Sequence, residues 1–115
     1  MRLTFIQLPT FVSDWRRLKL NDNDLRALEA LLLEDPSRGP VMSGTGGLRK
    51  LRFAPPSWRK GKSGATRVGY AYMFEYETVL LVVMYSKDEK GNLSPSERLQ
   101  VKALLERIKR AIAKE

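Results

Sequence analysis

The chain has 115 residues, 43% of them apolar, and we expect one domain with its own hydrophobic core over residues 1–115. It contains no cysteine and no histidine, which excludes disulfides, thiolate zinc sites and cysteine nucleophiles, and we expect no metal and no other cofactor. The net charge of +8 is a local feature. Eight basic residues and no acidic residue lie between Pro36 and Phe74, and the other 13 basic residues balance the 13 acidic ones. Such a local cationic field attracts a polyanion.

The strand, two helices and connections before this basic stretch are predicted from short-range patterns. Residues 3–8 alternate as a strand does, and Pro9 ends that strand. Ser13 is a cap for a short helix over residues 13–18. Asn21 caps a second helix over residues 22–33, whose leucines recur on one face.

Three strands and a helix follow. Residues 48–54 alternate after a glycine-rich passage, and residues 67–75 form a strand with two distinct faces. Residues 78–86 are apolar on both faces, which indicates a central strand. Ser94 and Glu97 form a capping box that opens a helix to about Ala113. The order predicts an α+β fold: a small, largely antiparallel sheet with two N-terminal helices and a C-terminal helix packed on one face.

No membrane segment or targeting signal is predicted. The longest apolar run, residues 79–85, is far too short to span a bilayer, and no basic region followed by an apolar block opens the chain. We therefore expect a cytoplasmic protein that does not contact membranes.

Lys50 and Arg52 are the first candidate site residues. They lie two positions apart on a predicted strand, so both side chains share one face, roughly 7 Å apart. Arg67 on the next strand is expected to lie across from them, and three cations on one face suit a phosphate. A sheet face whose charges only keep the protein soluble is an equally good interpretation at this point.

The loop after this strand is a second candidate. It holds one aromatic and three basic residues among glycines and serines: Trp58, Arg59, Lys60 and Lys62. Trp58 is suited to stacking on a base, and the cations to following a nucleic-acid backbone. A solvated basic loop remains the alternative.

Two further sets carry weaker signals. The first is the four tyrosines Tyr70, Tyr72, Tyr76 and Tyr85. Tyr70 and Tyr72 fit core packing better than a site, although one tyrosine hydroxyl at an edge would serve an active site. Lys87 and Lys90 follow the central strand, where loops often carry function, but charged turns are common.

Taken together, several ordered segments resemble the HigB-like branch of the RelE toxin superfamily. They are residues 45–52, residues 61–64, Arg67 with Val68 and Tyr70, residues 85–90, and Leu93 with Ser94. The resemblance covers about residues 44 to 98 and implies a small toxin of a type II toxin–antitoxin system with a RelE-like, microbial ribonuclease-type fold. Members of the family cleave mRNA on the ribosome, without a metal, and are silenced by a cognate antitoxin.

The resemblance also implies roles for individual residues. Lys50, Arg52 and Arg67 correspond to catalytic cations of the family, and Lys87 or Lys90 to a basic residue after the last strand. We also expect six further residues to contact RNA: Arg49, Trp58, Arg59, Lys60, Lys62 and Tyr70. Lys50 is our candidate for the base, because clustered cations lower the pKa of a lysine.

The implied partners are the ribosome, mRNA and an antitoxin with a helix-turn-helix, through which alone operator DNA would be contacted. Two other hypotheses stay open. One is a non-catalytic RNA- or ribosome-binding module that uses the same cations only to hold phosphates. The other is an inactive toxin that acts with its antitoxin in repressing its own operon.

Overall fold

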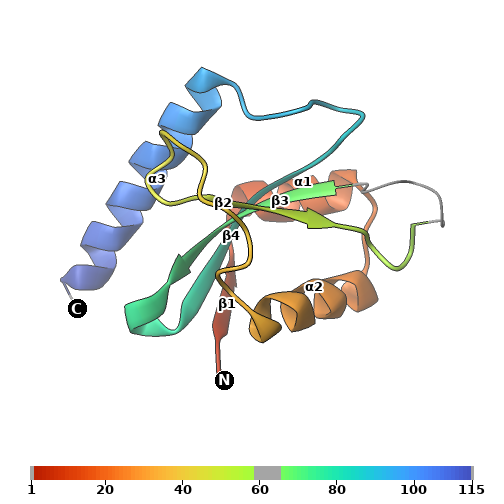
Figure 1. Cartoon of the computed structure of the whole chain (residues 1–115), viewed down its shortest axis with the longest axis horizontal. Helices are drawn as coiled ribbons and strands as arrows, with labels where there is room; N and C mark the ends of the chain where they lie inside the picture. Colours follow the sequence, from red (N-terminus) through yellow and green to blue (C-terminus); the bar gives the residue numbers. More distant parts are fainter. Residues whose placement is uncertain (1, 59–65, 115) are drawn as a thin grey trace.

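The computed structural model describes residues 2–58 and 66–114, which form a four-stranded sheet with three α-helices (Figure 1). The strands are β1 (Thr4–Gln7), β2 (Arg49–Phe53), β3 (Thr66–Met73) and β4 (Thr78–Ser86). The helices are α1 (Pro9–Arg17), α2 (Asp22–Glu34) and α3 (Pro95–Ala113), with a 3₁₀ turn η1 (Phe74–Tyr76) between β3 and β4. The predicted α+β class is confirmed. None of the helices in these ranges is long and apolar enough to cross a membrane.

The sheet is mixed rather than purely antiparallel. Its strand order is β1-β4-β3-β2, and β3 runs antiparallel to both of its neighbours. β1, however, pairs with β4 in the parallel sense. The expectation of a largely antiparallel sheet is therefore confirmed. The parallel pairing of β1 was not predicted, because the alternating pattern of a short segment carries no information about the direction of its partner.

The helices cover both faces of the sheet, and the prediction that they share one face is wrong. α1 and α2 contribute Phe11, Leu28 and Leu32 to the core on one face. α3 contributes Val101 and Leu105 to a second core on the opposite face. Figure 1 shows α3 apart from α1 and α2. A central strand that is apolar on both faces requires a helical layer on each side, because either face would otherwise meet water.

Two element boundaries differ from the sequence prediction by more than one residue. α1 begins at Pro9, four residues before Ser13, because proline at the first helical position has a φ suited to the helix and needs no N–H partner. β3 ends at Met73, and the chain then turns through η1, with Glu77 in the left-handed region at φ 48°.

Side chains of α1 close the edge of β4 that extends beyond β1. Thr10 donates a hydrogen bond to the carbonyl of Val82, and the Met84 N–H donates to the carboxylate of Asp14 at 2.8 Å. Arg17 completes the set by donating to the Met84 carbonyl at 3.3 Å. These contacts satisfy backbone groups that an open sheet edge would expose.

Asp24 joins the start of α2 to the segment that follows β2. It is fully buried and forms a capping box with Asn21, the residue predicted to cap this helix. Its carboxylate also accepts hydrogen bonds from the N–H and hydroxyl of Ser57, at 2.9 and 2.6 Å. Burial alone would raise the pKa of Asp24, but the hydrogen bonds from Ser57 and Asn21 outweigh burial and hold this pKa below its ordinary value.

We expect Asp24→Ala to lower the free energy of unfolding at pH 7 by about 3 kcal/mol, because a buried carboxylate and its hydrogen bonds are lost together. A depressed pKa stabilises the fold above the ordinary pKa of the group and ceases to do so as the pH falls through the depressed value. The deficit of the variant should therefore narrow below about pH 4. Urea titrations at pH 7 and pH 3 measure both effects, with Asp22→Ala in the same helical turn as control. A deficit independent of pH would contradict this account.

Candidate functional site

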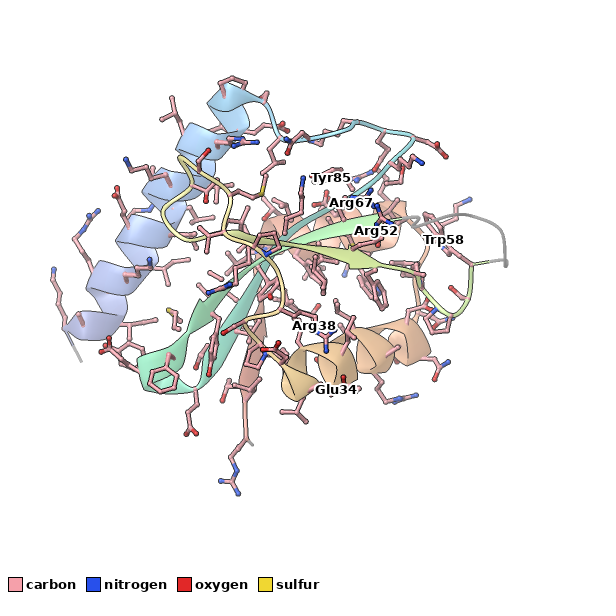
Figure 2. The ribbon with its side chains drawn as sticks, viewed as in Figure 1. Glu34, Arg38, Arg52, Trp58, Arg67 and Tyr85 are labelled. Atoms are coloured by element: carbon pink, nitrogen blue, oxygen red, sulfur yellow. The ribbon has the colours of Figure 1, made fainter. Side chains whose placement is uncertain are left out.

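Three side chains form a row across the sheet, on the face that α3 covers. Arg52 of β2 lies directly opposite Arg67 of β3, and Arg67 lies directly opposite Tyr85 of β4. Figure 2 shows the three residues in succession across the strands. Residues paired in this way have Cβ atoms about 5 Å apart, so their side chains are neighbours. We call Arg52, Arg67 and Tyr85 the cross-strand row.

A β-bulge in β4 brings Tyr85 onto this face. Gly69 pairs with Val83 and Tyr70 with Leu81, which leaves Val82 as an extra residue. Val82 and Val83 consequently both pack on the α3 side. The alternation is shifted by one from there onward, and Tyr85 faces α3 instead of α1 and α2. Bulges commonly re-aim side chains beside functional sites.

Gly69 leaves the space that the bulge needs. A Cβ atom at this position would lie 2.6 Å from Cγ2 of Val83 and 3.0 Å from Cδ2 of Leu48. Lys50 is opposite Gly69 on β2, half-buried and on the same face as Arg52, as the sequence predicted. The strand pair therefore brings Lys50, Arg52 and Arg67 to one face, next to a position without a side chain.

Tyr85 lies under a group of charged side chains from the following loop and from α3. The ammonium of Lys90 is 5.3 Å from the centre of the Tyr85 ring and forms an ion pair with Glu97 at 2.5 Å. Burial raises the pKa of the Tyr85 hydroxyl, the positive charges of Arg67 and Arg98 oppose that rise, and Glu97 adds to it. The net direction is upward, so this phenol stays protonated at neutral pH.

The turn that carries Lys90 is held by an ion pair with α1. The Arg17 guanidinium donates to both carboxylate oxygens of Glu89, at 2.7 and 3.0 Å, and the Ser86 N–H donates to Glu89 at 2.9 Å. The hydrogen bonds from Arg17 lower the pKa of Glu89. A cavity of about 490 Å³ lies between α1, the end of β4 and α3, and Tyr85 and Lys90 are part of its wall.

Other predicted site residues lie elsewhere. Tyr70 is fully buried on the opposite face, where its hydroxyl accepts a hydrogen bond from the Gly39 N–H at 3.0 Å, so it cannot contact RNA and that prediction was wrong. Arg49 is half-buried and donates to the carbonyls of Ser37 and Gly39, at 3.0 and 2.7 Å, away from the row. Lys87 is exposed in the turn after β4 and has no hydrogen bond or ion pair within residues 2–58 and 66–114.

The predicted basic loop is only partly described. Trp58 is half-buried in the turn after β2 (Figure 2). Its backbone N–H donates a hydrogen bond to the Pro55 carbonyl at 3.0 Å. The other three residues of that prediction lie outside the described residues: Arg59, Lys60 and Lys62.

The sequence analysis missed Tyr85 as a member of the row, and Glu97 and Arg98 as charged groups that act on its hydroxyl. Tyr85 was given no role of its own, and Glu97 was interpreted only as a helix cap. The one available signal was Gly69, because an isolated glycine within a strand pattern suggests a bulge or a close approach. Within the described ranges, no group of three or more acidic side chains is placed to hold a metal ion.

Comparison with solved structures identifies the fold as that of the bacterial toxin RelE. The variant of Escherichia coli toxin RelE in which two arginines are replaced by alanine, in the free state, superposes with a TM-score of 0.56 at 17% sequence identity. The match covers 87% of this chain and 97% of that one. A metal-bound toxin from Helicobacter pylori matches with a TM-score of 0.44 at 18% identity, over 76% of this chain and 98% of that one. No family model matches the sequence.

We expect Gly69→Ala to lower the free energy of unfolding by about 1–3 kcal/mol, because the added methyl group meets a stiff β-branched valine side chain at the bulge. Gly91→Ala is the matched control, since a Cβ there meets nothing within 4 Å and its φ is not in the left-handed region. Thermal or urea unfolding of both variants measures the difference. Equal free energies of unfolding for the two variants would contradict this account, because they would show that Val83 and Leu48 move aside for the methyl group without cost.

Proposed function

We propose that this chain is the toxin of a type II toxin–antitoxin pair and that it cleaves mRNA bound to the ribosome in the cytoplasm. The observation that most directly supports this proposal is the pairing of Arg52 with Arg67 on neighbouring strands. Like charges directly opposite each other destabilise a sheet, and an anion held between them converts that repulsion into attraction. The RelE-like fold supports the same proposal, as does the acid-free basic stretch in which both arginines lie.

The reaction that suits these groups is attack of a ribose 2′-hydroxyl on the adjacent phosphate. Arg52 and Arg67 would hold the non-bridging oxygens and stabilise the charge that develops on them. Lys50, on the same face, is our candidate to accept the 2′-hydroxyl proton. In this scheme side-chain cations supply the charge stabilisation, and no metal takes part in the reaction.

Lys90 and the basic loop would contribute binding. Lys90 is within reach of the row, at the ring of Tyr85, and would exchange its ion pair with Glu97 for a phosphate. Trp58 and the three cations after it are proposed to contact the message or ribosomal RNA. The antitoxin, which we propose contains a helix-turn-helix, would silence the toxin and supply all contact with operator DNA.

We expect Arg67→Ala to relieve growth arrest and to reduce ribosome-dependent cleavage by about 10²-fold or more, because one of the two groups that stabilise the phosphorane is lost. Lys50→Ala should act in the same direction. Arg26→Ala, an exposed arginine of α2, serves as control and should keep full activity. Mapping of transcript 5′ ends after brief induction measures the cleavage directly, within translated frames.

Three outcomes would contradict or change the proposal. Full toxicity of both Arg67→Ala and Lys50→Ala would contradict the assigned site. Transcripts that remain intact while the protein binds ribosomes in a strongly salt-dependent manner would favour a non-catalytic binding module. Intact transcripts without ribosome binding would favour an inactive toxin that acts with its antitoxin on its own operon.

A further inference from the structure

The hydroxyl of Tyr85 has no structural purpose that the fold explains. The residue is 3% exposed, and its Oη atom is the single buried side-chain polar atom in the described ranges without a hydrogen-bond partner. Burying an unpaired hydroxyl costs free energy, whereas phenylalanine would fill the same volume without that cost. An unsatisfied polar group in a folded protein therefore needs an explanation.

The position of this hydroxyl supplies one. Tyr85 is the end of the cross-strand row, directly opposite Arg67, so it adjoins the place where a phosphate held by Arg52 and Arg67 would lie. Glu97 and Arg98 face it from α3, and Lys90 covers its ring. Because burial keeps the phenol protonated, it is suited to giving a proton and unsuited to taking one.

We propose that Tyr85 is the general acid of the cleavage reaction and donates its proton to the 5′-oxygen that leaves the scissile phosphate. This inference rests on the proposed function and assigns the acid that the chain, without histidine, otherwise lacks. The 2′-oxygen forms a bond to phosphorus and gives its proton to Lys50. The bond from phosphorus to the 5′-oxygen breaks, and that oxygen takes the phenol proton. The products are a 2′,3′-cyclic phosphate and a 5′-hydroxyl. Lys50 then releases the proton it accepted to water, and the phenolate takes one proton from water, which restores both side chains.

In this proposal Lys90 controls access to Tyr85, because its ammonium lies over the Tyr85 ring. Its ammonium and the Glu97 carboxylate form an ion pair above Tyr85, with side chains 37% and 39% exposed. An ion pair this exposed contributes little to stability. A phosphate bound at the row would therefore compete with Glu97 for Lys90, and rotation of the lysine side chain would uncover the phenol.

We expect Tyr85→Phe to reduce kcat on ribosome-bound mRNA by about 10²–10⁴-fold, because proton transfer to the leaving group is lost, and to leave KM within about twofold. Its Tm should equal or exceed that of the wild-type protein, since an unpaired buried hydroxyl is removed. Tyr70→Phe is the matched structural control. Its hydroxyl is paired with the Gly39 N–H, so its removal should lower Tm by about 4–8 °C. Tyr76→Phe, at a half-exposed position far from the row, should change neither property.

The chemical role is tested with an mRNA in which sulfur replaces the bridging 5′-oxygen at the cleaved bond. A thiolate leaves without protonation, so Tyr85→Phe should cleave this substrate as fast as the wild-type protein does. Equal impairment on the oxygen and sulfur substrates would overturn the general-acid role, and so would wild-type rates of Tyr85→Phe on the oxygen substrate. If Arg67→Ala is inactive in the same assay, the proposed function survives either result. A wild-type protein that cleaves no message on the ribosome would overturn both.

Discussion

Burial of β4 on both faces is the constraint on which the rest of the structure depends. Val79 and Leu81 face the layer of α1 and α2, whereas Leu80 and Val82 face α3, and all four are at most 1% exposed. Burial of apolar surface is the dominant favourable contribution to folding, so a strand of this kind imposes two helical layers and a place inside the sheet. The part of its edge that extends beyond β1 is closed by polar side chains of α1. On the other edge, β3 and then β2 extend the sheet toward the basic stretch.

The site follows from an irregularity in that central strand. Without the bulge at Val82, strict alternation would direct Tyr85 toward α1 and α2, and Arg67 would face a different neighbour. The bulge needs Gly69 on β3, because a larger residue would collide with Val83. One glycine and one extra residue thus determine which side chains meet Arg67. The α3 capping box then fixes Glu97 near Lys90, so a helix cap also becomes part of the surroundings of Tyr85.

Local patterns in the sequence predicted the parts of the fold that short-range physics determines. Four features were found in this way: the Asn21 cap, the Ser94 capping box, the central strand 78–86 and the shared face of Lys50 and Arg52. The parallel pairing of β1 and the placement of α3 on the second face depend on contacts between distant segments, which periodicity does not encode. For the same reason Tyr85 was not recognised as a neighbour of Arg67: a bulge is defined by the register of two strands, and Gly69 alone did not specify it. The RNA contact predicted for Tyr70 was wrong because its hydroxyl is buried and accepts a hydrogen bond from the Gly39 N–H. Gly39 lies thirty-one residues away in the chain, so the sequence pattern around Tyr70 did not reveal this contact.

Unfavourable features gather at one end of the sheet. Arg52 opposes Arg67, the Tyr85 hydroxyl is buried without a partner, and Gly69 leaves no room for a methyl group. Together they break three ordinary rules of strand composition in one place, which is typical of a functional site. The same features bear on the proposed reaction. Lysine and tyrosine both exchange protons poorly near neutral pH compared with histidine, so such a site gains most from a substrate already held in reactive geometry. A ribosome that presents the message in that geometry would supply what the side chains lack, and dependence on the ribosome would then be a consequence of the residues available at the row.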